Sequence, residues 1–230
     1  HEGGTEKLLE RLKDPKTRER IKKEIDPVQQ AMSGYENLYI TYTFTESNKR
    51  FQGKSLAEIS KILHKDPLDA AFDLIIEEKA KVGMMRFAMD EEDVKKVIQS
   101  PFSMIGSDGS ALSLEGVLSS GHPHPRNFGT FPRVIARYVR ELKTLTLEVA
   151  IHKMTYLSAR RIGLFDRGVI RPGAFADIVI FDFDKIQDTA TYDNPKSYPQ
   201  GIAYVIVNGA PTLEGSQHTG ARPGKVLKKK

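Results

Sequence analysis

Strand-like and helix-like segments alternate along the middle of this sequence, and the alternation limits the folds that the chain can adopt. Three segments are predicted strands because apolar, aromatic and β-branched residues dominate them, namely 37–43, 82–89 and 102–106. Helices are predicted between and after them, with starts at Ser55, Asp66 and Asp90. Such alternation favours parallel strands joined by helical crossovers. Three units cannot close an eight-stranded barrel, so the sequence predicts an α/β fold that is either a small open sheet or the last part of a larger (β/α)8 barrel.

The two ends of the chain follow other patterns. Residues 1–35 are predicted to form two short helices, one capped by Thr5 and one beginning at Asp14-Pro15. After Gly163 short strands replace helices, and Asn208-Gly209 is a strong signal for a β-hairpin. We therefore expect a helical insertion or lid, a set of strand–helix units and a mostly β region, at 1–35, 36–163 and 164–230.

Composition excludes several classes of protein. Hydrophobic residues make up 39% of the 230 residues, which supports a packed core, and no apolar run reaches the roughly 18 residues that a membrane helix needs. The absence of cysteine excludes disulfides and a cysteine-based zinc site in this segment, and it fits a cytoplasmic protein. The formal charge is +5, but basic residues alternate with acidic ones from Lys7 to Glu24, and the only purely basic run is Lys228–Lys230. We therefore expect neither a nucleic-acid partner nor a membrane partner.

The loop that begins at Gly106 carries the strongest candidate for chemistry. Asp108 follows a predicted strand, and the glycines around it let the backbone approach a ligand closely. In β/α folds the active site lies at the carboxyl ends of the strands, where a carboxylate can bind a metal or accept a proton from metal-bound water. An aspartate before glycine is also common in turns, and the tripeptide alone favours that structural interpretation.

The same loop continues through His122, His124 and Arg126. The two histidines form an H-x-H pair of the kind that binds zinc, but each precedes a proline and no nearby histidine completes a site. Packing or hydrogen bonding within the loop is therefore the favoured interpretation for both. Arg126 can bind a carboxylate through two hydrogen bonds, and a surface salt bridge is an equal alternative.

Longer motifs resemble one family of enzymes. Five segments are similar, in sequence and in order, to N-acyl-D-amino-acid deacylases (D-aminoacylases) of the amidohydrolase superfamily: HEGGTEKLLERLKDP, MIGSDG, HPHPRNFGTFPRV, LTLEVAIHKMTYLSARRIGLFDRGVIRPGAFADIVIFD, and the stretch from GIAYVIVNGAP to HTGARPG. The part RGVIRPGAFADIVIF is less specific, because it occurs across amidohydrolases generally. The resemblance implies the C-terminal part of a zinc-bearing (β/α)8 barrel followed by part of a small β-sandwich. It also implies hydrolysis of the amide bond of N-acyl-D-amino acids, which releases a carboxylate and a D-amino acid.

The resemblance also assigns roles to residues. It implies that Asp108 acts as base on the metal-bound water, or binds the metal, and then protonates the leaving amine. Arg126 matches an arginine proposed to hold the substrate carboxylate, and Gly109 and His124 are expected to contact the substrate. The family's zinc ligands are an early H-x-H, a cysteine and later histidines, and none of these motifs is present. We therefore expect the ligands in an upstream half of the same enzyme, before His1, and no activity from this segment alone.

Two other functions stay open. The first alternative is a non-catalytic fragment or interaction domain that keeps the fold. The second is part of another cyclic or linear amidohydrolase, such as a dihydroorotase-like enzyme. Metal content separates the first of these from the deacylase, because an aspartate that acts beside zinc has no role without the metal.

Overall fold

The computed structural model describes residues 3–228, which form two compact units. Unit 1 contains the described residues up to Met89 together with Ser113–His124, and unit 2 contains Asp90–Leu112 together with the described residues from Pro125. The residues at 1–2 and the end of the basic run, at 229–230, lie outside the described part. No helix within 3–228 has both the length and the apolar character needed to span a membrane.

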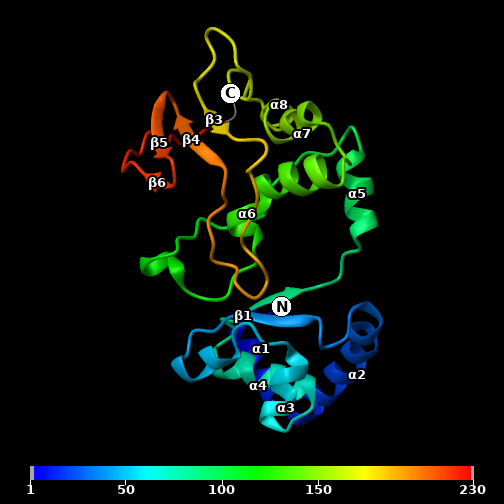
Figure 1. The fold of residues 1–230 in the computed structure, drawn as a ribbon. Helices are drawn as coiled ribbons and strands as arrows, with labels where there is room; N and C mark the ends of the chain where they lie inside the picture. Colours follow the sequence, from blue (N-terminus) through cyan, green and yellow to red (C-terminus); the bar gives the residue numbers. More distant parts are fainter. Residues whose placement is uncertain (1–2, 229–230) are drawn as a thin grey trace. The chain divides into compact units, whose positions relative to one another are not determined.

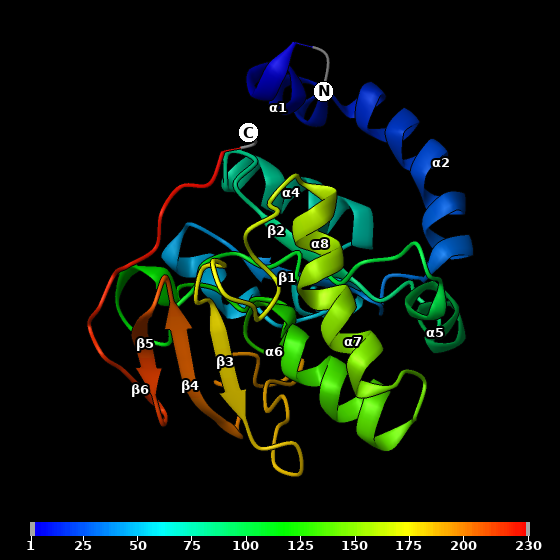
Figure 2. The same ribbon diagram turned by 90° about the horizontal axis from the view of Figure 1, so that it is seen from above.

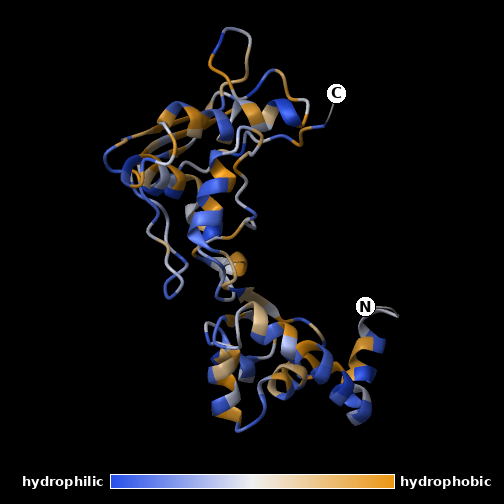
Figure 3. Cartoon of the chain, turned by 90° about the vertical axis from the view of Figure 1, so that its right-hand side faces the viewer, coloured by the Kyte–Doolittle hydropathy of each residue, from blue (hydrophilic) through white to orange (hydrophobic). Residues whose placement is uncertain are grey.

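Unit 1 combines helices with a two-stranded sheet (Figure 1). Its helices carry separate hydrophobic and hydrophilic faces (Figure 3), and the hydrophobic faces enclose a core in which Phe51, Leu56 and Ile59 are at most 2% exposed. Its elements in chain order are α1 (Gly4–Lys13), α2 (Pro15–Met32), β1 (Leu38–Tyr42), the 3-10 helix η1 (Glu46–Phe51), α3 (Leu56–Leu63), α4 (Pro67–Glu77), β2 (Gly83–Arg86) and the 3-10 helix η2 (Gly116–Ser119).

Capping side chains start three of these helices where the sequence predicts. Asp14, Ser55 and Asp66 each accept a hydrogen bond from a backbone N–H in the first turn of α2, α3 and α4. Each cap satisfies an amide that the helix itself leaves without a partner. The predicted cap at Thr5 is wrong. Gly3 adopts a left-handed conformation with φ of 84°, so α1 begins at the next residue and Thr5 lies inside the first turn.

Strands β1 and β2 pair antiparallel, which corrects the prediction of parallel strand–helix units. The register places Tyr39 opposite Met85 and Ile40 opposite Met84. When one helix connects two neighbouring strands, it carries the chain back to the starting end of the sheet, and the second strand runs parallel to the first. Here two helices, α3 and α4, separate the strands. The second helix reverses the chain once more, and β2 therefore runs antiparallel to β1.

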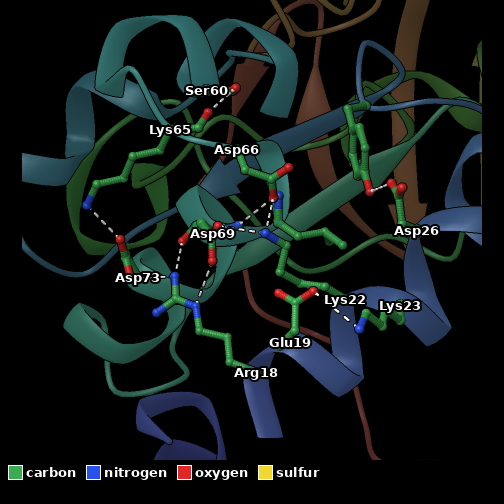
Figure 4. A network of polar contacts seen from close by, with 12 residues as sticks. Arg18, Glu19, Lys22, Lys23, Asp26, Ser60, Lys65, Asp66, Asp69 and Asp73 are labelled. Carbon is green, nitrogen blue, oxygen red and sulfur yellow. Dashed lines mark hydrogen bonds and ion pairs between the residues drawn. The ribbon is translucent and has the colours of Figure 1, made fainter. Parts of the chain in front are cut away.

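Ion pairs join α2 to α4 (Figure 4). Arg18 contacts Asp69 through Nε at 2.8 Å and Asp73 through Nη2 at 2.7 Å, and Lys22 Nζ lies 2.7 Å from Asp69. Burial raises the pKa of Asp69, but hydrogen bonds from Lys22 and Arg18 outweigh burial and hold that pKa below its ordinary value. These ion pairs help to hold the N-terminal half of α2 against α4, together with Ile21, which packs against the core of unit 1.

Unit 2 begins with α5 (Glu91–Gln99), which starts at the predicted cap Asp90. The predicted strand at 102–106 is wrong, because no extended segment among the described residues pairs with it. The amide of Ile105 instead donates to the carbonyl of Lys153 at 3.3 Å. The remaining helices of unit 2 are α6 (Arg126–Arg133), the π-helix η3 (Val134–Glu141), α7 (Leu147–Met154) and α8 (Tyr156–Arg161).

A four-stranded antiparallel sheet follows these helices, with β3, β4, β5 and β6 in sequential order (Figure 2). The predicted hairpin at Asn208-Gly209 is confirmed, since these residues join β4 to β5 with φ values of 48° and 82°. Two positive φ values match the tight turn that best fits the twist of paired strands. The mixed α/β class is thereby confirmed. The strands are β3 (Ile178–Phe181), β4 (Ile202–Val207), β5 (Ala210–Glu214) and β6 (Gln217–His218).

Arg167 holds the turn of the β4–β5 hairpin in place. Its side chain is buried, pairs with Asp177 and donates from Nη2 to Asn208 Oδ1 at 2.7 Å. The amide of Asn208 in turn donates to Asp177 Oδ1 at 2.8 Å, and the guanidinium lies 4.1 Å from the centre of the Phe175 ring. Arg167 and Asp177 of the segment RGVIRPGAFADIVIFD therefore have a structural role, because they hold the turn between β4 and β5.

We predict that Arg167→Lys loosens this turn. Lysine keeps the charge but cannot bind Asp177 and Asn208 with one planar fork. Loss of a charge-assisted hydrogen bond of about 1.5–3 kcal/mol corresponds to amide hydrogen exchange at Asn208 roughly tenfold faster or more. Arg171→Lys, at an exposed arginine of the same segment, should leave that exchange rate unchanged. Equal exchange rates in both variants would contradict the assignment.

Candidate functional site

Asp108 and Arg126 form an ion pair between the loop at 106–112 and the start of α6. Arg126 Nη1 lies 3.0 Å from Asp108 Oδ2, and the two side chains are 44% and 83% exposed. The residues are separated by a loop that leaves unit 2 and returns to it. The structure therefore brings together two residues that the sequence singled out as candidates, with both charged groups open to solvent.

Gly109 lets this loop lie directly against α6. A Cβ atom at position 109 would sit 3.2 Å from the Cα of Asn127 and 3.5 Å from the carbonyl oxygen of Arg126. Next to it, the amide of Ser110 donates to Asn127 Oδ1 at 2.6 Å. A side chain here would force the neighbouring backbone to give by a few tenths of an ångström, so glycine favours the close approach of the two backbones. Its predicted contact with substrate stays a prediction.

Asp108 itself has an unusual backbone conformation. Its φ of 50° lies in the left-handed region, which costs a non-glycine residue roughly 1 kcal/mol or more and which aspartate tolerates better than most side chains. Such outliers persist where the surroundings hold them, and they gather at functional sites. His64, Lys79, Ala80, Lys143 and Asn208 also have positive φ values, so this conformation is equally that of a turn residue and the role of Asp108 stays a prediction.

Lys153 on α7 holds the other side of the loop, and the sequence reasoning missed it. Its ammonium group donates to the carbonyl of Ser100, to the carbonyl of Ser103 at 2.9 Å and to Ser103 Oγ at 3.1 Å. Three acceptors match the three N–H bonds of a protonated lysine. The side chain is 3% exposed, and burial lowers its pKa. A signal existed in the sequence, because Lys153 lies at helical spacing from Ala150 on a core-facing side.

The two loop histidines belong to unit 1 and not to the unit that holds Asp108 and Arg126. The amide of His122 donates to the carbonyl of Thr41 at 2.6 Å, and the ring of His122 lies against Gly53. This agrees with the interpretation of His122 as a packing residue. His124 is half-buried in the same segment. Of the predicted site residues, the structure therefore groups Asp108, Gly109 and Arg126.

The grouped residues offer two kinds of chemistry. An exposed carboxylate can accept and return a proton, and a guanidinium can bind a carboxylate through two parallel hydrogen bonds. A metal ion needs three or four ligands, and of these residues only the carboxylate of Asp108 could serve as one. Within 3–228, no three His, Asp or Glu side chains gather in a way that could hold a metal ion.

We predict that Lys153→Met frees the segment that leads to Asp108. Methionine fills similar space but leaves buried carbonyl groups without donors, at a cost of about 1–3 kcal/mol each. The amide of Ile105 should then exchange hydrogen at least about tenfold faster, measured by NMR or mass spectrometry. Lys96→Met makes the same change on an exposed face of α5 and should have no such effect. An Ile105 amide that stays equally protected in both variants would exclude Lys153 as an anchor.

Comparison with known proteins identifies the family. The model of the amidohydrolase family (Amidohydro_3) matches residues 38–213. The chain is 41% identical over 190 residues to N-acyl-D-glutamate deacylase, and 38% identical over 185 residues to D-aminoacylase, both from Alcaligenes xylosoxydans xylosoxydans. These alignments cover 83% and 80% of this chain. They cover only 36% of each relative, so the chain spans about a third of the length of these relatives.

Solved structures agree with the sequence relatives. N-acyl-D-glutamate deacylase from Bordetella bronchiseptica, complexed with zinc and a phosphonate mimic of the tetrahedral intermediate, matches with a TM-score of 0.74 at 40% identity. That alignment covers 87% of this chain and 39% of the other. A structure of D-aminoacylase matches with a TM-score of 0.68 at 37% identity. Since the family model also covers more than half of the sequence, this chain belongs to the amidohydrolase family.

Proposed function

We propose that this chain supplies the catalytic aspartate and a substrate-binding arginine to a zinc-dependent N-acyl-D-amino-acid deacylase. The enzyme hydrolyses the amide bond and releases a carboxylate and a free D-amino acid. The observation that carries the proposal is the ion pair of Asp108 with Arg126, because the groups suited to proton transfer and to carboxylate binding are neighbours. The names of the relatives, N-acyl-D-glutamate deacylase and D-aminoacylase, support this choice of substrate.

The proposal also covers the architecture. Residues 36–163 contribute to the end of a (β/α)8 barrel, residues 164–230 to a small β-sandwich, and residues 1–35 to a helical insertion. The similarity to a zinc-bound deacylase at a TM-score of 0.74 supports the first part. The antiparallel sheet of β3 to β6 supports the second. The antiparallel pairing of β1 with β2 sets this two-stranded sheet apart from the parallel strands of a barrel.

Asp108 moves the proton in the proposed reaction. A water oxygen attacks the carbonyl carbon of the amide while Asp108 accepts one proton of that water. Asp108 then donates the proton to the amide nitrogen as the C–N bond breaks, which yields the carboxylate and the amine. The exposed carboxylate of Asp108 supports this proposal, because no group of the described chain covers it apart from its contact with Arg126.

Arg126 binds the carboxylate of the amino-acid part of the substrate. In the structure Nη1 of Arg126 contacts Asp108, and in this proposal the substrate carboxylate replaces Asp108 on the guanidinium. An exposed ion pair contributes only about 0–1 kcal/mol, and the exchange therefore costs little. The exchange also releases the Asp108 carboxylate for proton transfer, which couples recognition of an α-carboxylate to activation of the base.

The zinc ligands are proposed to come from the upstream half of the same enzyme, because the described residues do not fit a metal site on their own. Zinc, when bound, polarises the amide carbonyl and makes water more acidic. Gly109 and His124 remain proposed substrate contacts. A dihydroorotase-like activity and a non-catalytic role are not favoured, since no observation in the structure or among the relatives described above points to either.

We predict that Asp108→Asn in the full-length gene product, purified with zinc, lowers turnover of N-acetyl-D-glutamate at least about a hundredfold. Asparagine keeps the shape of the side chain but cannot take the proton, and general acid–base catalysis contributes about a hundredfold or more. Asp193→Asn alters an exposed aspartate in another loop of unit 2 and should keep normal turnover. Near-normal turnover in Asp108→Asn would remove Asp108 from the mechanism.

We predict that Arg126→Lys acts mainly on substrate binding. A point charge replaces a planar fork, so KM for N-acetyl-D-glutamate should rise about tenfold while kcat changes much less. Arg133→Lys makes the same change on α6 at a residue that pairs with Asp188, and it should leave KM unchanged. A fall in kcat without a rise in KM would show that Arg126 does not hold the substrate carboxylate.

A further inference from the structure

Unit 1 contains a half-open cavity of about 250 Å³ lined by residues of α2, α3, α4 and the β1–β2 pair. Two of its lining residues, Ile25 and Met84, are 41% and 59% exposed. The cavity lies entirely within unit 1, whereas Asp108 and Arg126 belong to unit 2. Most of its wall is apolar, formed by residues that include Leu38, Ile40, Phe72 and Val82.

Arg86 is the charged group in this wall. Its Nη2 donates to Gln29 Oε1 at 2.6 Å, and its Nη1 lies 3.3 Å from Met32 Sδ. Its Nε is buried and has no hydrogen-bond partner among the described residues. Throughout 3–228, no carboxylate lies within ion-pairing distance of Arg86. The guanidinium is therefore charged, half-buried and uncompensated.

Gln29 holds Arg86 in place. The Gln29 side chain is 4% exposed, and its Nε2 donates to the carbonyl of Gly34 at 2.7 Å. That bond fixes the amide so that its oxygen faces Arg86. A neutral amide satisfies one N–H of the guanidinium but does not balance its charge. Gln29 therefore positions the guanidinium of Arg86, but no negatively charged group among the described residues balances its charge.

The chemistry of the wall defines the ligand. A guanidinium that is never deprotonated and lacks a counter-charge favours a carboxylate, which matches its fork. The apolar surface favours an aliphatic chain. At roughly 30 Å³ for a group of the size of water, 250 Å³ accommodates on the order of eight such groups.

We propose that this cavity binds a short aliphatic carboxylate of about four to eight carbons, with its carboxylate on Arg86 and its chain among the apolar residues. The carboxylate accepts hydrogen bonds from the N–H groups of Nη1 and Nη2 that do not face Met32 and Gln29, and the chain displaces water from the apolar wall. Because the cavity shares no residue with the Asp108 loop, this site is independent of the proposed catalytic function.

Methyl NMR of the full-length gene product, labelled at its methionines, tests the proposal. Hexanoate should shift the signal of Met84 and leave that of Met154 in unit 2 unchanged, with the Met84 signal assigned by Met84→Leu. Hexanol, which has the same chain without the charge, should bind at least about tenfold more weakly. Titration in the Arg126→Lys variant should give the same shifts, which separates this cavity from the catalytic site.

Variants at Arg86 complete the test. Arg86→Met should abolish the preference for hexanoate over hexanol, and Arg86→Lys should retain part of it in case the methionine variant is unstable. Arg20→Met, at an exposed arginine of α2, should bind hexanoate normally. The proposal is overturned if hexanoate causes no shift at Met84, if hexanol binds equally well, or if both Arg86 variants keep the full preference.

Discussion

The site depends on the contact between the backbone of Gly109 and the first turn of α6. Asn127 receives the loop there, because its Cα approaches position 109 closely and its side chain accepts the amide of Ser110. Once this contact forms, Asp108 and Arg126 are neighbours. Lys153 holds the preceding segment. The backbone of Asp108 is thus held on both sides while its carboxylate stays open to solvent.

Local features of the fold were predictable from sequence. The caps at Asp14, Ser55, Asp66 and Asp90 depend on one side chain and an amide two or three residues away, so the sequence carries the whole interaction. The turn at Asn208-Gly209 is equally local, because both residues accept the positive φ values that it needs. Asp108 and Arg126 were singled out by their residue types and their place in one loop, and the resemblance of the surrounding motifs to deacylases then gave each a role.

Features that depend on distant partners were not predictable in the same way. Residues 102–106 have the composition of a strand, but a strand also needs a neighbour, and Ile105 bonds to Lys153 instead. The direction of β2 depends on how two helices fold back, which apolar periodicity does not encode. Lys153 resembles a surface lysine until α7 is packed against the loop. The ion pair of Asp108 with Arg126 likewise becomes visible only in three dimensions.

The central claim is that this chain belongs to an enzyme that hydrolyses N-acyl-D-amino acids with the aid of zinc. The most direct test measures release of the free amino acid from N-acetyl-D-glutamate and from N-acetyl-L-glutamate by the zinc-loaded full-length gene product. We expect hydrolysis of the D enantiomer alone, loss of activity when zinc is chelated and recovery when zinc is restored. Equal rates for both enantiomers, or no release from N-acetyl-D-glutamate, N-acetyl-D-aspartate or a neutral N-acetyl-D-amino acid with zinc bound, would contradict the account.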